Sequence, residues 1–206
     1  GQTYLKPPGP CKSRWPEGEV NVEVECCERC DIYILDVTAQ VQVSDCRDCR
    51  IVIGPCAGSV FLMDCVGCTI SVAARQIRLR DVTDCELRTH TPMPEAFIVE
   101  SSRLLRVSSF DVEYEGIAAQ WELAGFSGAP NDHWRRIFDF SADANPGHKA
   151  WEEVADVKPS RLFVSPEGLC GGKLVVQAGA NELDFDDYEH DDSPPTVIRL
   201  ESTGGS

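Results

Sequence analysis

The chain has 206 residues, of which 42% are apolar and 26% charged, and its formal net charge is −15. This composition is ordinary for a globular protein with one good core, and the acidic balance argues against a nucleic-acid partner, because phosphate binding needs a basic face. No stretch approaches the roughly 18 apolar residues of a membrane span and no signal-like segment opens the chain, so we expect a cytoplasmic protein without direct membrane insertion.

The first segments of the chain predict an arm followed by short strands. Residues 1–18 are rich in proline and are expected to form an extended N-terminal arm. From Glu19 onward apolar and polar residues alternate, as in Val22 and Val24, and the alternation returns in short segments as far as Phe110. A period of two is typical of β-strands with one buried face, so the sequence predicts an all-β core.

Three Cys-x-x-Cys pairs punctuate these strands at a constant interval of 19 residues, and they are Cys27/Cys30, Cys46/Cys49 and Cys65/Cys68. The 15 residues between neighbouring pairs would suit a four-thiolate zinc site. A fixed period of about 20 residues is also typical of a solenoid, in which each repeat forms one coil of a stack.

The later repeats separate these two interpretations. With the step shortened to 17 residues, the register continues to Val82 and Cys85 and then to Val99 and Ser102. Valine has no lone pair for a metal, but it can replace cysteine in a core, where a free thiol behaves as a small apolar group. We therefore favour a parallel β-helix with coils of about 17–19 residues over a zinc site. The apolar residues two places after each second position are Ile32, Ile51, Ile70, Leu87 and Leu104.

The eleven cysteines are expected to be reduced. Their odd number and their equivalent coil positions argue against a disulfide scaffold. A redox role for the pairs has little support, because no thioredoxin-like βαβ pattern surrounds them. The sequence also lacks a dinucleotide fingerprint and a phosphate-binding Gly-Lys-Ser/Thr loop, so we expect no cofactor, no metal and no catalytic turnover of its own.

Beyond the strands the pattern becomes helical. Over residues 114–126, Ile117, Trp121 and Ala124 share one helical face. We expect this helix to cap the open end of the stack, because a solenoid must cover its terminal core. A second apolar cluster, expected to pack against the helix, consists of Trp134, Ile137, Phe138 and Phe140.

The last part of the chain is expected to be an extension. We place the β-helix domain and its helical cap at residues 19–158 and the extension at 159–206, with a strand at 174–176. Residues 182–192 hold seven acids but lack the spaced ligands and central glycine of an EF-hand. A solvated acidic segment is therefore favoured over a calcium site.

The segment at residues 75–81 is the strongest candidate site. If its two apolar residues face the core, the intervening polar residues face outward together on one strand, and these are Gln76, Arg78 and Arg80. Guanidinium groups on a rigid support suit phosphate oxygens. Exposed arginines on a sheet are also common without any function, so the residues alone leave a merely solvated face open.

Five segments of the chain resemble sequence motifs of a known family and follow one another in the same order. They are residues 27–34 (CERCDIYI), 58–61 (GSVF), 75–81 (RQIRLRD), 99–102 (VESS) and 134–140 (WRRIFDF). They are similar to the domain shared by tubulin-binding cofactor C and the related retinitis pigmentosa protein, and the similarity is closer to the latter. The resemblance covers roughly residues 19–140. It implies a right-handed parallel β-helix.

The resemblance also implies a function, namely the stimulation of GTP hydrolysis on a partner in its GTP-bound state. The partner would be an Arf-like small GTPase or, in the cofactor C branch, tubulin. Arg78 matches the family's arginine finger, which stabilises charge on the γ-phosphate and is worth about 10³–10⁵ in rate. Gln76 would support the finger or the partner's catalytic water.

The resemblance assigns partner contacts to residues near the finger. Glu100 and Phe140 match positions that contact the GTPase, and the neighbouring Arg75 and Arg80 are expected to face the partner as well. Arg75 departs from the family pattern, in which a glutamine precedes Gln76. The added positive charge could strengthen phosphate attraction or change the choice of GTPase.

One alternative remains beside the activator hypothesis. The same face could bind the GTP-bound partner as a non-catalytic effector or scaffold. Either function implies a cytoplasmic protein associated with the cytoskeleton, or with the cilium and its basal body.

Overall fold

The computed structural model describes residues 3–6, 21–127, 131–142 and 149–154, together with the backbone of short segments at 160–161, 164–165, 168–169 and 196–199. Most of the predicted N-terminal arm, the strand predicted at 174–176 and the acidic run at 182–192 lie outside these residues. The division of the chain at residue 158 therefore stays a prediction.

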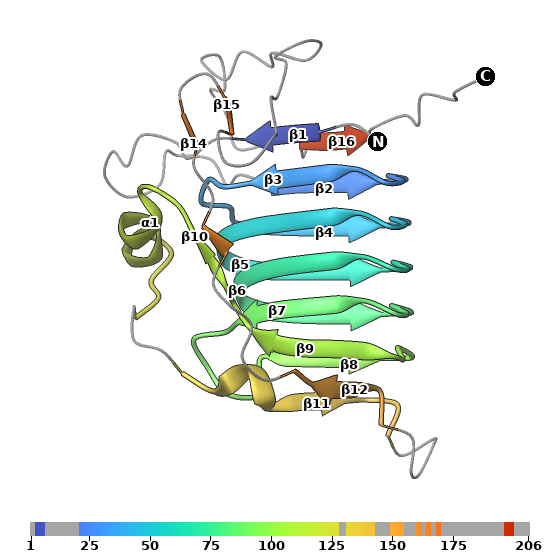
Figure 1. Cartoon of the computed structure of the whole chain (residues 1–206). Helices are drawn as coiled ribbons and strands as arrows, with labels where there is room; N and C mark the ends of the chain where they lie inside the picture. Colours follow the sequence, from blue (N-terminus) through green and yellow to red (C-terminus); the bar gives the residue numbers. More distant parts are fainter. Residues whose placement is uncertain are drawn as a thin grey trace, which may run out of the picture.

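The described strands form a parallel β-helix, as predicted, whose coils stack on one another (Figure 1). Twelve strands make one hydrogen-bonded system, because the long strands β5 (Arg50–Met63) and β6 (Thr69–Arg80) run through both faces of the stack. The first face contains β2 (Asn21–Glu25), β4 (Gln40–Ser44), the later parts of β5 and β6, β8 (Phe97–Glu100), β11 (Ile137–Asp139) and β16 (Thr196–Arg199). The second face contains β1 (Thr3–Lys6), β3 (Asp31–Ile34), the earlier parts of β5 and β6, β7 (Glu86–His90), β9 (Leu105–Ser109) and β12 (Trp151–Glu153).

Two smaller pairings lie outside this system. β10 (Val112–Glu113) pairs in parallel with β13 (Ser160–Arg161), and β14 (Val164–Ser165) pairs antiparallel with β15 (Gly168–Leu169).

Each coil turns from the first face to the second through a tight corner built on the cysteine pair. Every corner has two residues with positive φ, one directly before each cysteine position, and they are Cys26/Arg29, Asp45/Asp48, Asp64/Gly67, Asp81/Asp84 and Ser101/Leu104. Aspartate and glycine tolerate this left-handed conformation better than most residues. The sequence Asp-Cys-x-Asp/Gly-Cys, which occurs at the second and third corners, therefore specifies a corner, not a set of metal ligands.

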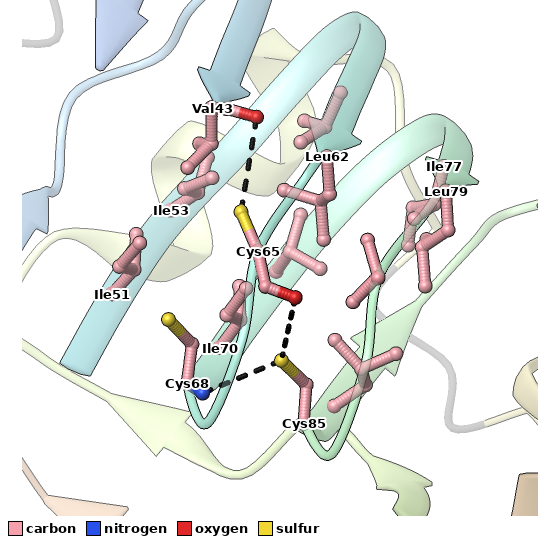
Figure 2. Close-up of a cluster of buried hydrophobic side chains, with 14 of the residues drawn as sticks. Val43, Ile51, Ile53, Leu62, Cys65, Cys68, Ile70, Ile77, Leu79 and Cys85 are labelled. Atoms are coloured by element: carbon pink, nitrogen blue, oxygen red, sulfur yellow. Dashed lines mark hydrogen bonds between the residues drawn. The ribbon is translucent and has the colours of Figure 1, made fainter. Parts of the chain in front are cut away.

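The corner thiols belong to the core, as Figure 2 shows for three of them. Cys65 Sγ donates to the carbonyl oxygen of Val43 at 4.0 Å, Cys85 Sγ donates to that of Cys65 at 3.7 Å, and the Cys68 N–H donates to Cys85 Sγ at 3.3 Å. The described cysteines are free thiols, and all but Cys26 are buried. No group of three or more His, Cys, Asp or Glu side chains in the described part of the chain is arranged to hold a metal ion.

The coil length changes along the stack. Val41 pairs with Val60 after 19 residues, Val60 pairs with Ile77 after 17, and Ile77 pairs with Phe97 after 20. The fourth corner is therefore placed as predicted, because Val66 stacks on Thr83, which brings the following cysteines, Cys68 and Cys85, into register.

The predicted fifth corner is wrong. Thr83 stacks on Arg103, so Ser102 takes the place of Val82, and Val99 lies within β8 opposite Leu79. Leu104 is 65% exposed, and Val107 takes the core position opposite Leu87. The cause is the loop at residues 91–96, which lengthens this coil relative to the preceding one.

The predicted helical cap is also misplaced. α1 (Ile117–Leu123) lies along the side of the stack (Figure 1), where Ala124 and Phe126 pack against Val37 and Ala73 from different coils. The end of the stack is covered instead by the 3-10 turn η1 (His133–Arg135), β11 and β12, whose apolar residues Trp134, Ile137 and Trp151 join the main core.

Two aromatic residues that we expected against the helix are exposed. Phe138 and Phe140 are 50% and 57% exposed. The reason is strand parity: β11 adds to the first face in register with β8, so Ile137 stacks on the buried Phe97 and Phe138 stacks on the outward Ile98.

Candidate partner-binding face

The later part of β6 presents its polar side chains outward, as predicted. Ile77 and Leu79 are buried in the core, whereas Arg78 and Arg80 are exposed and Gln76 is partly buried. The alternation follows from the pleat of a strand whose other face covers an apolar interior. The outward side chains of the first face around Arg78 are here called the Arg78 face, and they are Ser59, Phe61, Met63, Gln76, Arg78, Arg80, Ile98, Glu100, Phe138 and Phe140.

Apolar side chains flank Arg78 on the neighbouring strands. Phe61 and Ile98 are its direct partners in register on β5 and β8, and Phe138 follows beyond Ile98 on β11. The Arg78 guanidinium carbon lies 6.0 Å from the centre of the Phe61 ring, within the range of a cation–π interaction. Arg78 therefore stands in an apolar row that crosses the strands.

Arg78 forms no ion pair with any described residue, although the protein is strongly acidic. Its neighbour Arg80 lies 3.5 Å from Asp81, between Nε and Oδ2. Glu100 is the register partner of Arg80 and is exposed. The Phe140 N–H donates to the Val99 carbonyl at 2.9 Å, which holds Phe140 beside Glu100. The structure thus gathers four predicted site residues, Arg78, Arg80, Glu100 and Phe140, on one face.

The two aromatic rings at the end of this face contact each other. Phe138 and Phe140 form an edge-to-face pair, with ring centres 4.9 Å apart. At least half of the surface of each side chain is exposed. Exposed aromatic residues are enriched where proteins bind one another.

The other two predicted residues lie at a pocket beside the face. Ser59 Oγ donates to Gln76 Oε1 at 3.3 Å, and Arg75 Nε donates to the Ala57 carbonyl at 2.8 Å. A pocket of about 310 Å³ is lined by Gly58, Ser59, Arg75, Gln76 and residues 93–96. Gln76 therefore connects the pocket to the Arg78 face, while Arg75 is tied to the bend of β5 and does not share the row of Arg78.

The sequence-based prediction missed the apolar part of the site. Alternation with the buried Val60 and Leu62 places Phe61 outward, so this signal was available in the sequence. Ile98 and Phe138 could be placed only with the correct register of the fifth coil, which depends on the length of the loop at 91–96.

The fold and this face define a parallel β-helix protein that presents an exposed arginine, paired with no described acid, within a partly apolar surface, as is typical of protein–protein contacts. The family model described as Tubulin binding cofactor C matches residues 19–140, so the chain belongs to that family. The closer similarity to the retinitis pigmentosa protein stays a prediction.

A solved structure gives a second comparison. The chain is similar to "Tubulin Binding Cofactor C from Leishmania major", with 18% identity, a TM-score of 0.51, and coverage of 75% of this chain and 89% of that one. At this identity the likeness shows the fold alone. No curated protein matches the sequence. In the described part of the chain, no helix is long and apolar enough to cross a membrane.

Proposed function

We propose that this protein is a GTPase activator, whose Arg78 enters the nucleotide site of a GTP-bound, Arf-like small GTPase as an arginine finger. Tubulin, which the family name includes, is the second candidate substrate. The protein itself turns over no substrate on this proposal. Its place in the cell would follow its partner, in the cytoplasm with the cytoskeleton or at the cilium and basal body.

The observation that carries the proposal is the isolation of Arg78 on a rigid strand. It is exposed, and no described acid holds it. A planar guanidinium with five donors matches phosphate oxygens, and it acts most strongly where docking excludes water. The apolar neighbours Phe61, Ile98 and Phe138 supply such a dry surround once a partner covers them.

The remaining residues of the face would bind and orient the partner. Glu100 and Phe140 stand next to each other and would contact the GTPase surface, with Arg80 adding positive charge. Gln76 would hold the finger or the attacking water in place. Arg75 would contact the partner from the pocket side, because its guanidinium retains donors beyond the one given to Ala57.

A single-turnover assay tests the proposal. GTP hydrolysis is followed for a panel of GTP-loaded Arf-like GTPases and for tubulin, with wild-type protein, Arg78→Ala, Arg78→Lys and the control Arg103→Ala. Arg103 is an exposed arginine in the corner that follows β8, and it does not belong to the Arg78 face. We expect strong acceleration for one substrate, a loss of about 10³–10⁵-fold with Arg78→Ala, and no change with Arg103→Ala. Absence of acceleration for every substrate would refute the proposal.

A non-catalytic effector or scaffold is the alternative, and the exposed pair of Phe138 and Phe140 favours it as a binding surface. In that case Arg78→Ala would weaken binding to the GTP-bound partner while the intrinsic hydrolysis rate stays the same with and without this protein. Binding measured beside hydrolysis therefore separates the two functions.

A further inference from the structure

An arginine that is paired with an acid of its own chain must break that pair before it can bind a phosphate, which costs free energy. Arginine is long and has many rotamers, and this chain has 34 acidic residues against 19 basic ones. Two other exposed arginines, for example, are paired with acids: Arg80 with Asp81, and Arg106 with Asp84. Arg78 forms no such pair in the described part of the chain, and its neighbours explain why.

Phe61 supports the guanidinium from one side. It is the direct register partner of Arg78 on the parallel neighbouring strand, about 4.8 Å away in the hydrogen-bonding direction. Its ring is partly buried and faces the same side as Arg78, with the guanidinium carbon 6.0 Å from the ring centre. A ring face at this distance attracts the cation without neutralising its charge.

Ile98 closes the other side. It is the register partner of Arg78 on β8, and Phe138 stands beyond it. In the row that runs across the strands through Arg78, the two nearest positions on each side are Phe61 and Gln42, and Ile98 and Phe138. The first described carboxylate of the row, Glu23, lies three strands away on β2. The nearest acid of the face, Glu100, is one row away, opposite Arg80.

We propose that Phe61 and Ile98 are positioning residues for Arg78: the Phe61 ring supports the guanidinium, and Ile98 keeps a carboxylate from the position directly opposite Arg78 on β8. This inference rests on the proposed function. On this inference, the position of the Arg78 guanidinium depends on Phe61 and Ile98, its two register neighbours.

Substitutions at both neighbours test the inference in the single-turnover assay with the responding GTPase. Phe61→Leu keeps an apolar side chain but removes the ring, so the rate at saturating activator should fall by about 2- to 30-fold. The activator concentration that gives half the maximal rate should change little. Phe61→Tyr, which keeps a ring face, should keep the wild-type rate. The matched control Phe110→Leu removes a partly buried ring beside Trp121, outside the Arg78 face, and should leave the rate unchanged.

Ile98 is tested by a charge comparison. Ile98→Glu places a carboxylate directly beside Arg78, whereas Ile98→Gln adds similar size without charge. We expect the glutamate variant to be at least about tenfold slower than the glutamine variant, because a desolvated carboxylate competes with the phosphate for the guanidinium. Equal rates for the two, or a Phe61→Tyr variant as slow as Phe61→Leu, would overturn the inference. Thermal unfolding of each variant verifies the fold.

A measurement on the protein alone keeps this inference separate from the proposed function. If no GTPase responds to the wild type, the proposed function fails, and the Arg78 Nε–H signal in NMR still tests the positioning. We expect an order parameter for Arg78 that exceeds that of Arg103 and drops in Phe61→Leu. An Arg78 side chain as mobile as Arg103 in the wild type would contradict the positioning role.

Discussion

Two outward-facing arginines on neighbouring strands, Arg78 and Arg88, have opposite environments. Arg78 on β6 is exposed and has no ion pair among the described residues, whereas the Arg88 side chain on β7 is 17% exposed and bonded to both Glu86 and Asp111. Burial lowers the pKa of Arg88, but hydrogen bonds and the charges of the two carboxylates outweigh it, so the pKa is raised. Arg88 is therefore held in place by two carboxylates, whereas no described acid pairs with Arg78.

The difference comes from what covers each face. After β9 the chain returns along the second face, where Asp111 accepts a hydrogen bond from Ser71 Oγ at 3.1 Å and Tyr114 donates to the Leu35 carbonyl at 3.0 Å. Val112 packs in the same layer. Among the residues that the structure describes, none forms such a layer over Arg78 on the first face. The path of a later segment thus decides whether an outward-facing arginine is bonded within the protein or stays exposed. The ion pairs of Arg88 with Glu86 and Asp111 are here called the Arg88 clamp.

The largest expected effect separates the two arginines by function. Arg78→Ala should abolish about 4–7 kcal/mol of transition-state stabilisation on the partner while leaving the free energy of unfolding within about 0.5 kcal/mol. Arg88→Ala should do the reverse, with reduced stability and near-normal activation at temperatures where it stays folded. Hydrolysis assays and urea denaturation of both variants measure this. A large stability loss in Arg78→Ala would break the comparison.

The next effect concerns the ion pair between Arg88 and Asp111 within the Arg88 clamp. Asp111→Ala leaves the largely buried Arg88 with one carboxylate, so the free energy of unfolding should fall by about 3–5 kcal/mol. The control is Asp84→Asn, which removes the charge that pairs with Arg106 at 3.6 Å but keeps a residue suited to the positive φ of this corner, and it should cost at most about 1 kcal/mol. Urea denaturation gives both values, and similar losses would mean that coverage of the second face does not strengthen its ion pairs.

A smaller effect is expected in the interior that both faces share. Val82 already occupies the first cysteine position of its corner, so Cys46→Val should cost less than about 1.5 kcal/mol. Ser102 does the same in the next corner, where its hydroxyl donates to the Glu100 carbonyl at 2.9 Å, so Cys46→Ser should also fold. Denaturation with and without a chelator measures this; unfolding by the chelator would contradict a purely packing role.

The last effect is a pH dependence on the covered side. The His90 ring contacts Trp121, with ring centres 4.4 Å apart, and burial, assisted by the positive charge of His133, lowers the pKa of His90 to about 4. Because the pKa is about 6.5 in the unfolded chain, that state takes up the proton first as the pH falls. The stability contribution of neutral His90 is therefore complete above pH 6.5 and lost toward pH 4.

His90→Phe isolates this contribution from the carboxylates that titrate in the same range. The midpoint of unfolding should fall less steeply between pH 6.5 and 4 in the variant than in the wild type. Parallel curves would show that His90 is solvated and that α1 leaves this side of the stack open.

Local signals predicted the repeating parts of the molecule. Period-two alternation and the Cys-x-x-Cys pairs, continued to Val82 and Cys85, depend on neighbouring residues only, so the strands, four corners and the outward direction of Arg78 followed from the sequence. The prediction failed where geometry depends on contacts between distant segments. The loop at 91–96 shifts the register of the fifth coil. Without that register, the positions of Ile98 and Phe138 beside Arg78 could not be predicted from the sequence.

The location of the return segment was likewise beyond local signals. The amphipathic pattern of α1 identifies a helix with one buried face, but the same pattern suits the end or the side of a stack. The contact of Phe126 with Val37 and Ala73 decides between them, and these residues are distant in sequence. Arg88 could not be distinguished from Arg78 for the same reason, because its partner Asp111 arrives with that segment.

The position of β6 within the stack has a consequence for hydrogen exchange. Coils of a solenoid contact only their neighbours, so opening starts at the two ends and moves inward. The β6 strand pairs with β5 on one side and with β7 and β8 on the other, with further strands beyond in both directions. Its amides should therefore exchange last, and Arg78 should keep its support through openings that already release β1 or β12.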